Sequence, residues 1–167
     1  MTNSQKYKLS FTSVPLRLIE MVKIAKYAVE NDITDFSLVK DSGIVYGSLK
    51  NSTLKRHFRE LRNRLEKLTP DQLQILINGD LNSQKQVAFL AVCKYYDFIR
   101  DFAIDVIRDK SLVYDYKINE SDYNSFINNR IHFHPELEMF KDSTMKKAKQ
   151  VAYQPPFPES EYLDRGD

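Results

Sequence analysis

The stretch SQKQVAFLAVCKYYDFIRDFAIDVIRDK, residues 83–110, decides the fold. It contains no Gly or Pro, and Ser83 with Gln86 three residues later forms a capping-box pattern that marks a helix start. Apolar and aromatic residues cover most of its helical surface and leave one narrow charged stripe. Such a helix must be surrounded by other elements over most of its girth. The sequence therefore predicts an all-α protein, a compact multi-helix bundle around one long central helix.

Other segments have the spacing of shorter helices on either side of this one. The first begins near Ser13 and ends near Asn31. The others cover 34–40, 52–67, 70–78, 120–129 and 144–153, the last with Ser143 as its cap. Gly79 is expected to end its helix in the left-handed conformation. We predict a single all-helical domain over 1–153, with a basic N-terminal half (1–68) and a central-helix half (69–153). The Pro-rich, acidic residues 154–167 are expected to form a flexible tail.

Composition excludes several classes of protein. Cys93 is the only cysteine, so no internal disulfide can form, and its apolar surroundings predict a core residue. The longest uncharged apolar run has seven residues, 87–93, whereas a membrane-spanning helix needs about twenty. The N-terminus also lacks a signal-peptide pattern. We therefore expect a cytoplasmic protein with no membrane partner.

Charge is distributed unevenly along the chain, although the net charge is only +2. Residues 1–30 carry a net charge of +3, and residues 50–67 carry +5. Residues 101–167 carry −4. The basic character is concentrated in the first half, which indicates an anionic partner for that half.

The basic helix predicted over 52–67 is the best functional signal. Its cations lie mostly off the leucine stripe, where they can meet a polyanion such as nucleic acid. The alternative is a solvated helix face that Glu60 and Glu66 partly neutralise. Two short helices followed by this one also suggest a helix-turn-helix-like N-terminal part. The candidate nucleic-acid-binding residues are Lys6, Lys8, Arg17, Lys50, Lys55, Arg56, Arg59, Arg62 and Arg64, with Lys146, Lys147 and Lys149 as a second patch.

Catalytic and metal-binding patterns are weak. His132 and His134, with Glu136 and Glu138, have the composition of a zinc site, but no further Cys or His cluster accompanies them. The acidic run from Asp97 to Asp109 is explained by pairing with Lys94, Arg100 and Arg108. No glycine-rich phosphate loop or hydrolase elbow is present. We expect no metal, no cofactor and no enzymatic activity.

Several stretches together resemble the BrxA family of BREX bacteriophage-exclusion systems. The resemblance covers about residues 6–153, in order, and AVCKYYDFIRDFA is its most distinctive part. The stretches are YKLSFTSVPLRLIEMVKIAKYAVE, STLKRHFRELRNRL, LTPDQLQILINGD, AVCKYYDFIRDFAIDVIRDK and DYNSFINNRIHFHPELEMFKDSTMKKAKQV. The resemblance implies a NusB-like helical fold, binding of double-stranded DNA and an accessory role beside the other BREX proteins. After Tyr153 the Pro-rich tail departs from the family pattern, in which the last helix continues.

Two hypotheses about function follow. The first is a non-enzymatic DNA-binding accessory protein of a phage-defence system. The second is a protein-interaction adaptor of the defence complex, whose basic helix docks onto an acidic partner without physiological DNA binding. Because a basic helix alone does not distinguish A-form from B-form duplexes, RNA stays open as a ligand. The sequence does not indicate an oligomeric state.

Overall fold

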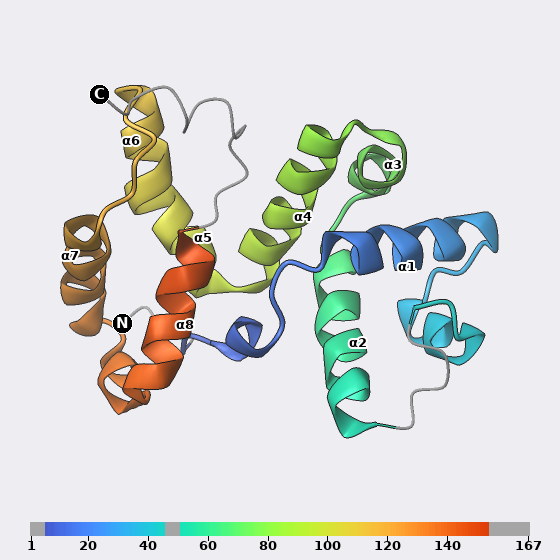
Figure 1. Ribbon diagram of the computed structural model, residues 1–167, viewed down its shortest axis with the longest axis horizontal. Coiled ribbons are helices and arrows are strands. Elements are labelled where there is room, and N and C mark those ends of the chain that lie inside the picture. Colours follow the sequence, from blue (N-terminus) through green and yellow to red (C-terminus); the bar gives the residue numbers. More distant parts are fainter. Residues whose placement is uncertain (1–5, 46–50, 154–167) are drawn as a thin grey trace. The chain divides into compact units, whose positions relative to one another are not determined.

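The computed structural model describes residues 6–45 and 51–153, and within these ranges it is helical, without strands (Figure 1). The all-α prediction is confirmed. The α-helices are α1 (Leu18–Glu30), α2 (Ser52–Leu65), α3 (Pro70–Asn78), α4 (Leu81–Tyr95), α5 (Asp97–Phe102), α6 (Arg108–Leu112), α7 (Glu120–Ile131) and α8 (Asp142–Ala152). Short 3₁₀ segments are η1 (Ser10–Ser13), η2 (Phe36–Ser42) and η4 (Pro135–Met139), and η3 (Ala103–Ile107) is a π-helix.

The chain forms two compact units. The continuous unit comprises residues 13–95, and the split unit comprises residues 1–12 together with 96–167. Whether both fold together as the one domain predicted from the sequence stays a prediction. The predicted tail, residues 154–167, lies outside the described residues.

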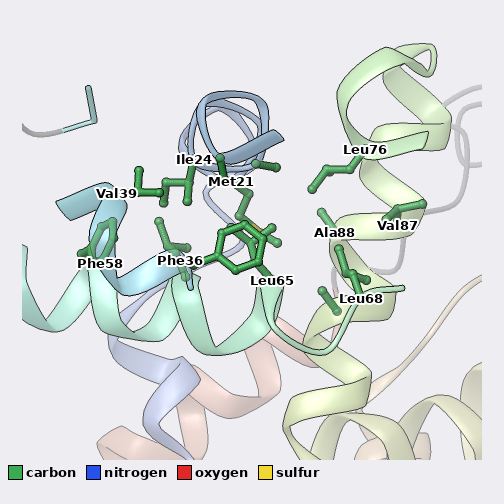
Figure 2. Close-up of a cluster of buried hydrophobic side chains, with 14 of the residues drawn as sticks. Met21, Ile24, Phe36, Val39, Phe58, Leu65, Leu68, Leu76, Val87 and Ala88 are labelled. Atoms are coloured by element: carbon green, nitrogen blue, oxygen red, sulfur yellow. The ribbon is translucent and has the colours of Figure 1, made fainter. Parts of the chain in front are cut away.

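The continuous unit has a core to which α1, η2, α2, α3 and α4 all contribute (Figure 2). Helix α1 contributes Met21 and Ile24, and α2 contributes Phe58, Leu61 and Leu65. Burying large apolar side chains such as these stabilises a fold by about 1.5–3 kcal/mol for each one. The buried apolar side chains of α2 therefore fix the helix by one face, and positions such as 55, 56 and 59 stay exposed.

The split unit has an aromatic core. Phe126 of α7 meets Phe98 and Phe102 of α5 edge-on, with ring centroids 5.5 and 5.2 Å apart. Phe11 of the N-terminal segment packs edge-on against Tyr96 at 5.1 Å. Edge-to-face geometry is favourable because the positive ring edge of one aromatic meets the negative face of the other.

The predicted central helix is not continuous, which corrects the expectation from the sequence. It breaks at Tyr96, whose backbone is extended (φ −113°, ψ 107°) and whose side chain is fully buried. Beyond the break, α5 passes through the π-helix η3 into α6. Since no Gly or Pro marks the break, tertiary packing of the Tyr96 ring overrides the helical pattern.

Helix α1 begins at Leu18, later than the predicted start near Ser13. Arg17 is the cause, because its left-handed backbone (φ 52°, ψ 50°) cannot continue a right-handed helix toward the N-terminus. Pro15 therefore lies before the helix. The second predicted helix, 34–40, is the 3₁₀ segment η2, which Asp35 caps by accepting the Ser37 N–H at 2.8 Å.

Local caps set the bounds of α3 and α4. The predicted capping box of Thr69 and Gln72 is confirmed. Gly79 is not left-handed as predicted (φ −71°, ψ 166°); it is glycine because a Cβ there would lie 2.5 Å from the Ile75 carbonyl oxygen. Helix α4 starts at Leu81 rather than Ser83, since the Asp80 carboxylate accepts the Ser83 N–H at 2.8 Å.

The caps of the last two helices differ in kind. Asn119 and Asp122 form a capping box at the start of α7. Helix α8 starts at Asp142 after Lys141, which makes no side-chain capping bond. Ser143 therefore lies inside the helix, and its predicted role as the cap is wrong.

Two helices end in the same hydrogen-bonding pattern with different residues at its left-handed position. After α1, the Ile33 N–H reaches the Ala28 carbonyl at 2.8 Å, and Asp32 is left-handed (φ 51°). After α6, the Asp115 N–H reaches the Lys110 carbonyl at 3.0 Å, and Tyr114 is left-handed (φ 57°). This is the Schellman motif, which usually has glycine at that position. A bulky residue there costs about 1–2 kcal/mol.

Candidate nucleic-acid interface

Helix α2 presents the candidate phosphate-binding side chains. Asn51 starts the helix by accepting the Thr53 N–H at 2.7 Å. Phe58, Leu61 and Leu65 are buried, and so are the polar residues Glu60 and Arg64. Lys55, Arg56 and Arg59 are exposed, and within the described ranges none of the three pairs with a carboxylate. These three cations form the basic face of α2.

Arg62 is already engaged within the helix. Its Nε lies 3.4 Å from Glu66 Oε1, and its Nη2 donates to Asn63 Oδ1 at 3.2 Å. The side chain is 30% exposed, so water still reaches it. Arg62 therefore lies at the margin of the basic face.

Arg64 does not lie on the surface, which corrects its assignment as a phosphate-binding residue. Only 1% of it is exposed. Its guanidinium donates to the carbonyl oxygens of Val14 at 2.5 Å and Pro15 at 3.0 Å. Because the donors are turned inward to backbone acceptors, Arg64 fastens the segment before α1 to α2 and is not accessible to a duplex.

Arg17 and His57 lie near the basic face. Arg17 is exposed and forms an ion pair with Glu20 at 3.1 Å. Burial lowers the pKa of His57, and the positive charges of Arg17 and Arg56 lower it further, against an opposing effect of Glu20. The positive charges of Arg17 and Arg56 therefore act together at His57, and such a position favours binding of a phosphate.

The remaining candidates are scattered. Lys6 and Lys8 are exposed on the N-terminal segment, and Lys146 and Lys147 are exposed on α8. Lys149 donates a hydrogen bond to Glu120 at 2.6 Å, which raises the pKa of Lys149. The Glu120 carboxylate partly neutralises this cation. Lys50 lies outside the described residues. All of these except Lys50 belong to the split unit, whereas the basic face of α2 belongs to the continuous unit.

The division of the chain into units also divides its charge. The continuous unit has thirteen basic and nine acidic side chains, a net charge of +4. The split unit has twelve basic and fourteen acidic side chains, a net charge of −2. The continuous unit therefore has the charge that attracts a polyanion.

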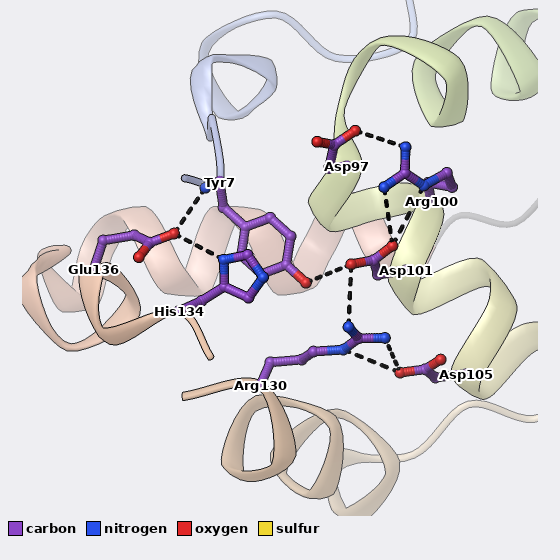
Figure 3. Close-up of polar contacts among 8 residues, drawn as sticks. All are labelled: Tyr7, Asp97, Arg100, Asp101, Asp105, Arg130, His134 and Glu136. Atoms are coloured by element: carbon purple, nitrogen blue, oxygen red, sulfur yellow. Dashed lines mark hydrogen bonds and ion pairs between the residues drawn. The ribbon is translucent and has the colours of Figure 1, made fainter. Parts of the chain in front are cut away.

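The histidines considered as zinc ligands do not form a metal site in the described residues. His134 is buried, stacks on Tyr7 and makes a 3.0 Å hydrogen bond with Glu136 (Figure 3). Glu136 also accepts the Tyr7 N–H at 2.8 Å. Over residues 6–45 and 51–153, no group of three or more His, Cys, Asp or Glu residues is arranged to hold a metal ion.

The acidic run is paired, partly through a residue that sequence reasoning missed. Arg100 bonds Asp97, three residues away, at 2.8 Å, as predicted. Arg108 bonds its immediate neighbour Asp109 at 3.0 Å instead of a carboxylate three or four residues away. Arg130 of α7, which was not predicted, bonds Asp101 at 3.3 Å and Asp105 at 2.5 Å (Figure 3). Lys94 was expected to join them, but it donates to Gln72 Oε1 at 2.7 Å instead. The prediction of Cys93 as a buried residue is confirmed.

Residues 5–165 match the sequence model of the family described as BrxA. The chain belongs to the BrxA family. The match runs past Tyr153, where the sequence resemblance was expected to end. No helix in the described part of this BrxA-family chain is long and apolar enough to cross a membrane.

Two curated relatives carry the description "BREX protein BrxA". The protein from Escherichia coli O9:H4 (strain HS) is 26% identical over 96 residues, which are 58% of this chain and 45% of that protein. The protein from Paramagnetospirillum magneticum (strain ATCC 700264 / AMB-1) is 26% identical over 101 residues, 60% of this chain and 51% of that protein. The BrxA-family chain thus spans about half the length of the curated relatives it matches.

A solved structure shares the fold. The crystal structure of an uncharacterized protein from Magnetospirillum magneticum superposes with a TM-score of 0.68 at 23% identity. The superposition covers 89% of the BrxA-family chain and 78% of the crystallised one. The NusB-like detail of the fold stays a prediction.

Proposed function

We propose that this BrxA-family chain is a non-enzymatic accessory protein of a BREX phage-defence system that binds duplex DNA. Lys55, Arg56 and Arg59 on the basic face of α2 are the main phosphate contacts, assisted by Arg62 and Arg17. Membership of the family supports the system, because curated relatives are described as BREX proteins. Other BREX proteins are its proposed partners.

One observation carries the DNA-binding part of the proposal. The three exposed cations of α2 lie within one and a half helical turns, and no carboxylate in the described residues pairs with them. An unpaired cationic face gains free energy by releasing the counterions condensed on a duplex. Arginine's planar fork also fits phosphate oxygens in a bidentate manner. The third element of a helix-turn-helix-like arrangement would place these side chains at a groove, and this placement is part of the proposal.

Fluorescence anisotropy of the full chain with labelled duplex DNA tests the proposal, with single-stranded DNA and an RNA duplex as comparisons. The informative variant is Arg56→Glu with Arg59→Glu. Its matched control is Lys23→Glu with Lys26→Glu, which makes the same net charge change on α1. We expect duplex affinity to fall about tenfold or more in the first variant and much less in the control. Equal losses in both variants would contradict a specific role for α2.

The adaptor alternative is separated in the same experiment. If Arg56→Glu with Arg59→Glu loses a BREX partner in a pull-down, while wild-type protein binds no duplex even at low salt, the basic face serves an acidic protein. If the variant loses DNA but keeps the partner, the face serves DNA.

A further inference from the structure

A groove in the split unit is lined by acidic side chains. It measures about 350 Å³ and lies between the η3–α6 segment and α7. Asp105, Asp109 and Asp122 line it, with Lys110 as the one basic side chain of the lining. The π-helix η3 forms part of its wall, and π-helical turns occur frequently at functional sites.

The carboxylates of the groove differ in how firmly they are engaged. Asp105 bonds Arg130, and Asp122 bonds Lys110 at 3.1 Å. Asp109 bonds Arg108, its neighbour in sequence, and 60% of the Asp109 side chain is exposed. Exposed ion pairs of this kind are weak, so Asp109 can exchange Arg108 for a cation from another molecule.

An exposed apolar segment adjoins this groove. Leu112 and Val113 are each 72% exposed and Tyr114 is 71% exposed, and Val113 also lines the groove. Three consecutive large apolar side chains at this exposure are unusual in a folded chain and typically mark an interaction surface.

Tyr114 of this segment also has an unusual backbone conformation. It occupies the left-handed position of the Schellman motif, where glycine is the usual residue and a tyrosine is strained. Burial of the ring does not compensate for this strain, because most of it faces solvent. Residues whose backbone strain is not offset by other interactions in the fold cluster at binding sites. At the equivalent position after α1 the residue is Asp32, a type that tolerates the left-handed conformation.

We propose that Leu112, Val113 and Tyr114 with the adjoining acidic groove form a docking site for another polypeptide, whose docking segment places an Arg or Lys beside large apolar side chains. Charge complementarity selects this occupant. With the ion-pair partners included, four carboxylates (Asp105, Asp109, Asp115 and Asp122) meet three cations (Arg108, Lys110 and Arg130), so the groove keeps a net negative charge that disfavours an acidic segment or a phosphate backbone. The apolar side chains provide the area that is buried on binding, and the carboxylates fix the position of the partner's basic residue. This site is separate from the basic face of α2 and does not depend on DNA binding.

The test uses the full chain and a labelled amphipathic peptide with Leu at positions i, i+3, i+4 and i+7 and Arg between them. One matched peptide has Glu in place of each Arg, and another has Asn in place of each Leu. Fluorescence anisotropy should show that each replacement weakens binding about tenfold or more. Absence of binding by the Leu–Arg peptide, or equal binding by the Glu peptide, overturns the proposal.

Tyr114→Gly is the decisive variant because it cannot be dismissed as a folding defect. Relief of the left-handed strain should raise the melting temperature by about 2–4 °C, while loss of the ring weakens the Leu–Arg peptide about tenfold. Asp32→Gly is the matched control, with a smaller thermal gain and unchanged peptide affinity. A lower melting temperature in Tyr114→Gly would show a structural role for the ring and overturn the proposal.

Charge and self-association are tested separately. Asp109→Lys should weaken the Leu–Arg peptide about tenfold, whereas Glu30→Lys, the same charge change at the end of α1, should leave it unchanged. Both variants should keep the wild-type affinity for duplex DNA, so a failed docking proposal remains distinct from a failed DNA proposal.

Dimerisation in sedimentation velocity that Tyr114→Gly abolishes would identify a second copy as the occupant and overturn the commitment to another polypeptide.

Discussion

Tyr7 lies flat against the imidazole of His134, with ring centroids 3.6 Å apart and an interplanar angle of 13°. The same tyrosine donates its hydroxyl hydrogen to Asp101 Oδ2 at 2.6 Å, and burial together with this bond raises the pKa of Tyr7 far above its ordinary value. One residue near the N-terminus therefore contacts elements that lie more than ninety residues later in the chain.

Tyr7→Phe tests the value of that hydroxyl. The ring keeps its stacking partner, but Asp101 loses a hydrogen bond and keeps Arg130 and Arg100. We expect the free energy of unfolding to fall by about 1–2 kcal/mol in urea denaturation, because the lost bond ends on a charged acceptor. Tyr114→Phe removes an exposed hydroxyl and should change stability by less than about 0.5 kcal/mol.

Glu136 makes the stability of the split unit depend on acid pH. Burial acts to raise the pKa of Glu136, but hydrogen bonds from the Tyr7 N–H, from its own backbone N–H and from His134 outweigh burial and lower it below its ordinary value of 4.5. A carboxyl with a lowered pKa stabilises the fold above the unfolded-state value, and this contribution is lost as pH falls through the folded-state value. Below about pH 4.5, wild-type stability should therefore fall more steeply than that of Glu136→Gln. Glu138→Gln, an exposed neighbour, should retain the wild-type slope.

Arg64 and Arg59 should respond oppositely to alanine. Arg64→Ala leaves buried carbonyls without donors, so we expect a loss of about 3 kcal/mol in unfolding free energy. Its folded fraction should keep the wild-type affinity for duplex DNA. Arg59→Ala should change stability by less than about 0.5 kcal/mol and weaken DNA binding. The reverse pattern in paired denaturation and anisotropy titrations would refute the assignment of Arg64 to structure and Arg59 to binding.

The salt dependence of DNA binding should count the contacts of α2. For each of Lys55→Ala, Arg56→Ala and Arg59→Ala, the slope of log affinity against log salt should become less negative by about 0.9. Lys40→Ala, an exposed cation on η2, should leave the slope unchanged. Unchanged slopes in all three α2 variants would remove this helix from the interface.

Local signals in the sequence predicted one helix start correctly and missed others, such as the cap assigned to Ser143. Thr69 and Gln72 form the capping box that their spacing indicates, because both partners lie within one helical turn. The break at Tyr96 could not be predicted in this way, since its partner Phe11 lies far away in sequence and no Gly or Pro interrupts the helical pattern. Arg130 was missed for the same reason, as its partners Asp101 and Asp105 belong to another helix.

For the basic helix, charge alone wrongly placed Arg64 on the surface, whereas its spacing from the leucines indicates burial. Arg64 follows Leu61 by three residues and precedes Leu68 by four, so it shares their buried face. That spacing was available in the sequence and separates Arg64 from Arg59. What the spacing cannot show is the acceptor, because the carbonyls of Val14 and Pro15 reach α2 only in the folded chain.

The division of the split unit into residues 1–12 and 96–167 imposes an order on synthesis. As the chain leaves the ribosome, the continuous unit has all of its residues once Tyr95 has emerged, and it can fold at that point. Tyr7, Leu9 and Phe11, which are buried in the finished protein, must wait in solvent until α5, α7 and η4 have been made. During that interval the nascent chain carries an exposed aromatic segment at its N-terminal end, which is open to capture by a chaperone or by another nascent chain.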